Sequence, residues 1–203
     1  MDSNFLITIY KYIKASMLYW LYLLRGLVVY SLIPSSCAIL LLIKDIEKKN
    51  DETDDGEEIS IKQLFKSHYE RYTHLKFPSF IFTNVLLVMF ACLYLVNLSE
   101  GSWALLISII LIYLIALTLA VLTYTIHFLV KVKEPFMRII AYSFTASVKN
   151  IIISLGLLVV LAVLYYVGTI NLVLFIVTFP FIYAYAIKSL LNNVGIPNLP
   201  KTE

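Results

Sequence analysis

Arg25 is the chemically active side chain with the most unusual surroundings in this sequence, because it lies in an apolar stretch that reaches from Ala15 to Ile43. On a spanning helix from Ala15 to Ile33, Arg25 would lie near the middle of the membrane, where an ionisable side chain costs at least about 2.5–3.5 kcal/mol. The other apolar stretches contain no Asp or Glu to pair with it. Arg25 would then face a polar cavity, an anionic ligand or an acidic residue of another subunit.

A second arrangement keeps Arg25 away from the membrane centre. If the span runs from Leu27 to Ile43, Arg25 lies at the interface and reaches lipid phosphates. That span only reaches the lower limit of about 17 residues for a transmembrane helix. We prefer this arrangement, because an arginine at membrane depth without a carboxylate is rarer than an interfacial one.

Pro34, Ser35 and Ser36 interrupt the same apolar stretch. Broken helices at membrane depth occur at transporter sites, but a lone proline followed by serines is also an ordinary kink, since the serines satisfy freed backbone groups. We prefer the kink. Together with Arg25 and with Asn84 in a later apolar stretch, the two serines are the candidates for a ligand contact or a polar path.

Other reaction chemistry has no support in the sequence. The three histidines, His68, His74 and His127, lack the spacing of metal ligands. Paired intramembrane carboxylates and a nucleophile elbow are missing as well. We therefore expect a non-enzymatic protein with no catalytic residue, no metal and no cofactor. The 16 Lys and Arg residues are dispersed and the net charge is only +3, so we also expect no nucleic-acid partner.

The elements that hold these residues are membrane-spanning helices. Hydrophobic residues make up 61% of the chain and the mean hydropathy is +0.87. A spanning helix needs about 20 mostly apolar residues. Four stretches after the N-terminal one come close to that length or exceed it: Ser79–Asn97, Trp103–Val130, Asn150–Val167 and Ile170–Ile187. The sequence predicts an all-α polytopic transmembrane bundle of about five spans, with residues 1–203 forming one membrane domain in the lipid bilayer.

The distribution of basic residues predicts the orientation. The link Lys44–Phe77 carries seven Lys and Arg and the link Lys131–Lys149 carries four, whereas Leu98–Ser102 and Gly168–Thr169 carry none. By the positive-inside rule, the long first link and the C-terminus are cytoplasmic. The protein is thus expected in the plasma membrane. A single N-terminal span would leave Lys11 and Lys14 outside, which is resolved by an interfacial helix over Asn4–Lys14.

Two cytoplasmic amphipathic helices are expected beside the spans. Residues 48–58 form an acidic loop that we expect to be mobile, because like charges repel. A Ser60–Gln63 capping box then starts a helix over residues 60–76 that ends before Pro78. Its apolar face makes it a candidate docking helix, through Phe65, Tyr69 and Tyr72.

The second amphipathic helix follows Pro135, which breaks the preceding helix. Its apolar stripe consists of Phe136, Ile139, Ile140, Ser143 and Phe144. Both amphipathic helices could dock a partner, or they could lie among anionic headgroups with their basic residues on the lipid charge.

The order of these elements resembles the YesL-like family of small bacterial membrane proteins. The resemblance is carried by an N-terminal span ending in Ile33–Ala38, a basic turn at Lys44, the helix containing Phe65, the segment Phe144–Lys149 before another span, and the closing segment Tyr183–Leu191. It departs from the family in having Ile33 where a glycine usually precedes the proline, and in its longer acidic loop. The resemblance implies a small helical membrane protein of unestablished activity, often encoded with carbohydrate importers.

The expected function is therefore that of an accessory or regulatory partner of a carbohydrate ABC-type importer or a related membrane complex, with a homo-oligomer as a further possible assembly. The alternative is a small carrier or channel-like protein with a polar path near Arg25. These two classes differ in whether several polar residues converge inside the bundle.

Overall fold

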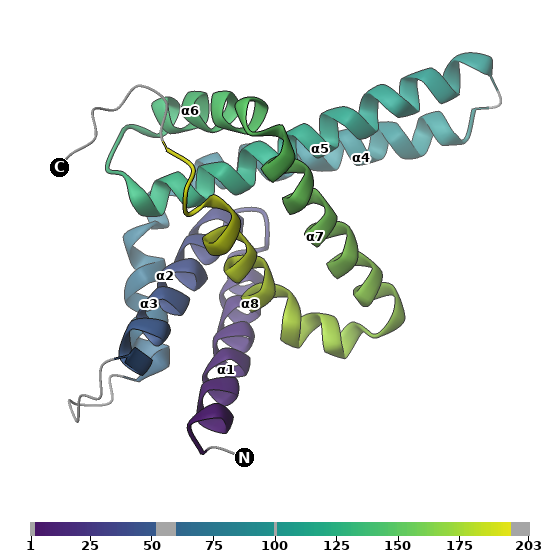
Figure 1. Ribbon diagram of the computed structural model, residues 1–203. Helices are drawn as coiled ribbons and strands as arrows, with labels where there is room; N and C mark the ends of the chain where they lie inside the picture. Colours follow the sequence, from purple (N-terminus) through teal and green to yellow (C-terminus); the bar gives the residue numbers. More distant parts are fainter. Residues whose placement is uncertain (1–2, 52–59, 100, 196–203) are drawn as a thin grey trace.

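The computed structural model describes residues 3–51, 60–99 and 101–195 (Figure 1). In these ranges the chain forms helices throughout, which confirms the all-α class: α1 (Ser3–Arg25), α2 (Leu32–Asp51), α3 (Ile61–Arg71), the 3-10 helix η1 (Thr73–Leu75), α4 (Lys76–Asn97), α5 (Ser102–Lys131), α6 (Phe136–Lys149), α7 (Ile151–Ile170) and α8 (Leu172–Leu191).

Four segments in the described residues are long and apolar enough to cross a membrane, close to the expected number of about five. They are Thr73–Asn97, Trp103–Lys131, Ile151–Ile170 and Leu172–Leu191. These segments form two helical hairpins, α4–α5 and α7–α8. The α4–α5 hairpin and the connected ends of α7 and α8 project in different directions, while the rest of α8 packs on α1 and α2 (Figure 1). Their surfaces are largely open: in the most apolar window of Thr73–Asn97 only 6% of the residues are buried.

The N-terminal apolar stretch differs from the expectation. It is not one spanning helix from Ala15 to Ile33 or from Leu27 to Ile43, because α1 ends at Arg25 and α2 begins at Leu32. The expected interfacial helix Asn4–Lys14 is continuous with the rest of α1. Pro34 lies in the first turn of α2, where a proline needs no amide partner, so it begins a helix and does not kink one.

A Schellman motif ends α1. The amide of Val28 donates to Leu23 O at 2.8 Å, and the amide of Leu27 donates to Leu24 O at 3.0 Å. Both Leu27 and Val28 have positive φ, 56° and 57°. Glycine normally fills the left-handed position of this motif, but here Gly26 precedes that position. The glycine thus stands one residue before the position where it would mark the end of the helix.

Helix α2 is the centre of the fold. It contacts α1, α3, α4, α5 and α8, and nearly every side chain in its first three turns is buried. Its apolar residues thus meet other helices of the same chain, which explains why this stretch is apolar on all sides. A helix that is hydrophobic all round is buried, either in lipid or in protein.

The first amphipathic helix begins as expected but by another mechanism. Ser60 caps α3 through its backbone carbonyl, which accepts from Gln63 N at 2.8 Å, and its side chain makes no capping bond. The helix ends at Arg71, earlier than predicted, and Pro78 lies in the first turn of α4. Because α2 extends to Asp51, the first four residues of the predicted mobile segment 48–58 are helical, while residues 52–59 fall outside the described ranges.

The second amphipathic helix, α6, begins directly after Pro135 as predicted and packs along α5. Its buried face consists of Ile139, Ser143, Ala146 and Ser147, whereas Phe144 is exposed. The apolar stripe is therefore rotated relative to the predicted one, because the small residues of α6 make the close contact with α5.

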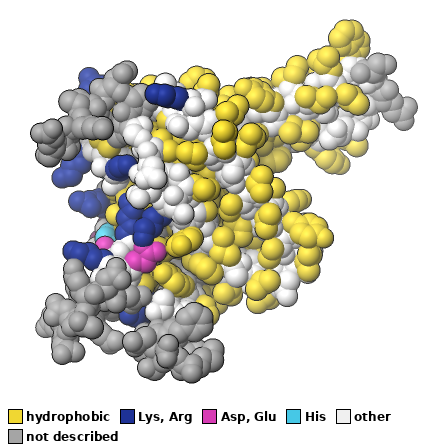
Figure 2. Space-filling model, viewed as in Figure 1, with side chains coloured by type: hydrophobic (Ala, Val, Ile, Leu, Met, Phe, Trp, Pro, Cys, Tyr) yellow, Lys and Arg dark blue, Asp and Glu magenta, His cyan; other side chains and the backbone are white. Residues whose placement is uncertain are grey.

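Charged side chains gather at one end of the molecule, around the C-terminal parts of α2, α5 and α8 and along α3, and we call this the charged end. Apolar side chains cover the two hairpins that extend away from it (Figure 2). A surface divided in this way is typical of a protein whose hairpins lie in lipid and whose charged end lies in water.

Candidate functional site

The structure brings Ser36 into a buried polar cluster between α1, α2, α5 and α8, and Ser35 is its neighbour in the first turns of α2. The hydroxyl of Tyr19 is hydrogen-bonded to Ser36, and the hydroxyls of Tyr183 and Thr123 lie 3.0 Å apart. Ser35 is completely buried and its Oγ has no hydrogen-bond partner in the described part of the chain. The polar groups of this cluster come from helices far apart in the sequence, which is why the spacing of residues did not reveal it.

Arg25 is not part of this cluster. It is exposed at the C-terminal end of α1 and makes no hydrogen bond or ion pair with any residue in the described ranges. A cation there is favourable because it lies at the negative end of the helix dipole. The turn that follows packs on the first two turns of α4, since Val29 O accepts from Ser79 Oγ at 3.0 Å and Tyr30 stacks on Phe80.

Asn84 is also separate from the two serines. Its side-chain amide donates to Phe80 O at 2.8 Å, within its own helix. The predicted ligand contact therefore does not form one site. Ser35 and Ser36 are buried, Pro34 lies beside them in the first turn of α2, and the polar side chains of Arg25 and Asn84 lie elsewhere.

The candidate docking residues Phe65, Tyr69 and Tyr72 lie inside the molecule. Phe65 is completely buried, and its ring lies 5.2 Å from that of Tyr22. The hydroxyl of Tyr69 lies 2.8 Å from Ser31 Oγ, which ties α3 to the turn between α1 and α2. The amphipathic face of α3 is thus covered by the chain's own α1 and α2, and the prediction that this face docks an external partner is corrected.

Three lysines meet at the charged end. Lys188 forms an ion pair with Glu47. Burial, together with the nearby charges of Lys131 and Lys188, lowers the pKa of Lys44 below its ordinary value. Beside them, His68 and Asp45 are joined by a contact of 2.7 Å. Cations therefore outnumber carboxylates around Lys44, which favours an anion in this region.

His127 lies under this group and was not selected from the sequence. It is 3% exposed, and neither ring nitrogen has a hydrogen-bond partner among the described residues. An ionisable side chain within an apolar span is itself a functional signal, and His127 lies within the apolar stretch Trp103–Val130. In the described ranges, no group of three or more His, Cys, Asp and Glu residues could hold a metal ion.

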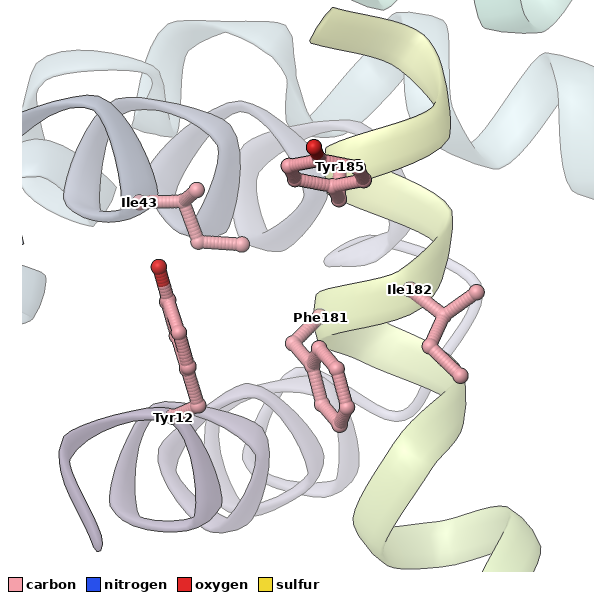
Figure 3. A pocket seen from close by; sticks show the side chains of 5 residues that line it. All are labelled: Tyr12, Ile43, Phe181, Ile182 and Tyr185. Carbon is pink, nitrogen blue, oxygen red and sulfur yellow. The ribbon is translucent and has the colours of Figure 1, made fainter. Parts of the chain in front are cut away.

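An apolar pocket of about 270 Å³ opens between α1, α2 and α8. Figure 3 shows its lining, with the hydroxyl of Tyr12 pointing toward Ile43 and the rings of Phe181 and Tyr185 on the facing helix. Tyr12 and Phe181 are stacked with ring centroids 5.7 Å apart. An apolar group such as part of an acyl chain fits this lining better than a polar molecule does.

A second pocket, of about 280 Å³, lies at the charged end between the α3–η1 junction and the link from α5 to α6. Its lining includes Arg71, His74, Lys131, Lys133 and Glu134. Tyr72 forms its wall and donates from its hydroxyl to Leu129 O at 3.4 Å. Burial raises the pKa of Tyr72 to about 12, so this hydroxyl remains protonated at neutral pH.

No family model, no curated protein and no solved structure matches this chain.

Proposed function

We propose that the protein is a non-enzymatic integral membrane protein that acts as an accessory or regulatory partner of a larger membrane complex. The observation that supports this role best is the exposure of the α4–α5 hairpin. The outer half of this hairpin extends beyond the other described helices (Figure 1), and large apolar side chains such as Val88, Leu95 and Ile109 are exposed on it. Such a hairpin offers a long lateral surface to the helices of another membrane protein.

The complex we propose is a carbohydrate ABC-type importer. This assignment rests on the resemblance to the YesL-like family in the residues quoted above, and on nothing in the packing of the helices. We place the charged end and the C-terminus in the cytoplasm, in agreement with the excess of Lys and Arg in the links at that end.

The alternative, a small carrier or channel, is favoured by the buried polar cluster around Ser35 and Ser36. A polar path needs several such groups in one continuous line through the membrane. Arg25 and Asn84 lie apart from the two serines, so the cluster has fewer polar members than the sequence had suggested. For this reason we rank the accessory role first.

Co-purification tests the accessory role. A tagged protein would be extracted from its native membranes in a maltoside detergent, and the proteins retained with it would be identified by mass spectrometry. Val88→Trp together with Leu95→Trp enlarges one exposed face of α4, because these residues are seven positions apart on a helix. We expect this variant to insert normally but to retain at least about tenfold less importer subunit, since bulky residues prevent close helix packing.

The matched control makes the same change on the other hairpin. Val159→Trp together with Val163→Trp enlarges an exposed face of α7 and should leave the retained importer unchanged. Failure of the wild-type protein to retain any importer subunit, with only copies of itself recovered, would refute the proposed partner and favour a homo-oligomer.

A transport assay separates the accessory role from the carrier. The purified protein would be placed in liposomes and supplied with radiolabelled mono- and disaccharides. Solute movement by the protein alone, reduced by Ser35→Val or by Arg25→Leu, would establish the carrier and overturn the accessory role. We expect no movement above that of empty liposomes.

A further inference from the structure

The pocket at the α3–η1 junction concentrates positive charge from two distant parts of the chain. Arg71 comes from the end of α3, whereas Lys131 and Lys133 come from the end of α5 and the link that follows it. The packing of Tyr72 against Leu129 holds these two parts together. The three cations thus share a single hollow of about 280 Å³, whose walls are a tyrosine ring and aliphatic side chains.

The one carboxylate in the lining is already neutralised. Glu134 Oε2 lies 3.3 Å from a guanidinium nitrogen of Arg138, which is not part of the pocket. The ammonium of Lys131 donates to the carbonyl of Asn192, at 3.4 Å, and pairs with no carboxylate in the described part of the chain. Within the described ranges, neither Arg71 nor Lys133 has an ion-pair partner. The pocket therefore carries an uncompensated charge of about three units, which an anion would balance.

The lining chemistry specifies what kind of anion fits. A guanidinium binds a tetrahedral oxyanion through two parallel N–H bonds, and ammonium groups act as point charges beside it. The Tyr72 hydroxyl already donates its one proton to Leu129 O, so Tyr72 contributes its ring and not a donor. Its ring, together with Leu129 and Ile139, provides apolar wall for the carbon atoms attached to the anion. This combination matches a phosphate group that is esterified to an organic moiety.

We propose that this pocket binds a phosphate group, held by Arg71, Lys131 and Lys133. Two sources present that chemistry at the surface of a membrane: the headgroup of an anionic phospholipid, and a soluble phosphate ester. The proposal is independent of the partner of the hairpins, because the pocket lies at the charged end and the hairpins project away from it (Figure 1).

The test compares two variants with the same change in net charge. Arg71→Gln with Lys133→Gln removes two cations from the pocket, and Lys62→Gln with Lys149→Gln removes two exposed cations outside it. Each protein, in maltoside without added phosphate, would receive phosphatidylglycerol or phosphatidylcholine, and lipid retention would be measured by native mass spectrometry. In a second arm, inorganic phosphate and glycerol 3-phosphate would be titrated by calorimetry. Gel filtration and unfolding temperature without ligand check the fold.

We expect the wild-type protein and the control variant to bind at least one of these probes equally well, and the pocket variant to bind it about tenfold more weakly or worse, since charge-assisted hydrogen bonds are lost. Arg71→Lys, which keeps the charge but loses the planar fork, should fall between them. Saturable binding of phosphatidylglycerol alone identifies the lipid as the source, and binding of glycerol 3-phosphate or phosphate identifies a soluble ester. Equal weakening in both double variants, or no saturable binding of any probe by the wild type, would overturn the proposal.

Discussion

Leu27 occupies a backbone position that glycine usually fills. Its φ of 56° is left-handed, and its side chain is 73% exposed, so replacing it removes little buried surface. The left-handed conformation costs a non-glycine residue roughly 1–2 kcal/mol, part of which is offset by the greater freedom of glycine in the unfolded chain. We expect Leu27→Gly to raise the free energy of unfolding by roughly 0.5–1 kcal/mol. Thermal unfolding in detergent measures the change, and a lower midpoint would contradict this account of the turn.

Gly26, one residue earlier, has no room for a side chain. A Cβ built there would lie 1.4 Å from Ser31 Oγ, and that hydroxyl is engaged with Tyr69. We expect Gly26→Ala to destabilise the protein by about 1–3 kcal/mol, the usual cost of overpacking. Gly156→Ala is the control, because its nearest neighbour, Leu190 Cδ1, would be at 3.9 Å. In a helix interior this second change should stabilise by roughly 0.5–1 kcal/mol.

Lys44 should make stability depend on pH. Below its lowered pKa the side chain is charged in both the native and the unfolded state, so its unfavourable burial and the repulsion from Lys131 and Lys188 are fully present. Between that pKa and the ordinary value of 10.5, the native state loses the proton first, and stability rises with pH. We therefore expect Lys44→Met to unfold at a higher temperature than the wild type at pH 7.

The difference between Lys44→Met and the wild type should shrink as the pH rises from the lowered pKa toward 10.5, because the native state then holds Lys44 neutral and free of the repulsion. Lys62→Met, at an exposed position of α3, is the matched control and should show no such trend. A gap that widens with increasing pH would mean that Lys44 is stabilised by an anionic group.

At the scale of elements, α3 stabilises the fold through its aromatic face. Phe65 is completely buried against Tyr22, whereas Phe144 on α6 is 51% exposed. We expect Phe65→Ala to lower the free energy of unfolding by about 3–5 kcal/mol, the usual cost of emptying an aromatic site. Phe144→Ala should change it by less than about 0.5 kcal/mol. Unfolding in detergent without any partner measures both, and similar small effects would mean that α3 is held by something outside the chain.

The spans could be predicted because each apolar run after residue 76 is about as long as a membrane-spanning helix or longer, so length and composition alone define them. The link between α7 and α8 was misplaced at Gly168–Thr169. It lies at Asn171, whose side chain caps α8 by accepting from Leu174 N at 3.0 Å. An asparagine cap three residues before a helical amide is a recognisable signal, but the uninterrupted apolar sequence obscured it.

The N-terminal hairpin could not be predicted from the sequence. The apolar stretch from Ala15 to Ile43 is compatible both with a helix in lipid and with two helices in a protein core. In addition, no left-handed glycine marks the turn. The buried cluster of Ser36, Tyr19 and Tyr183 depends on that turn, because only the reversal of the chain places α1 beside α2. Arg25 became prominent in the sequence for the same reason, since one of the two arrangements considered, a continuous helix from Ala15 to Ile33, would place it in the membrane centre.

At the scale of the whole molecule, the division of charge predicts an orientation in the membrane. Ser99, at the tip of α4–α5, and Asn193, after α8, lie at opposite ends of this division. With the exposed Cys92 replaced by alanine, we expect Ser99→Cys to react with a membrane-impermeant maleimide in intact cells. Asn193→Cys should react only after the cells are permeabilised. The reverse pattern would invert the proposed topology without affecting the fold.

Helix α5 is longer than the hydrocarbon core of a bilayer is thick. Its 30 residues extend about 45 Å at 1.5 Å per residue, whereas that core is about 30 Å thick. The exposed part, which includes Trp103–Tyr113, must therefore adjust its tilt to the lipid around it. The buried part of the same helix carries His127 and leads into Lys131. A thicker or thinner membrane would thus change the tilt of the exposed part of α5. Because α5 is one continuous helix, this change of tilt would reach Lys131 at the charged end of the protein.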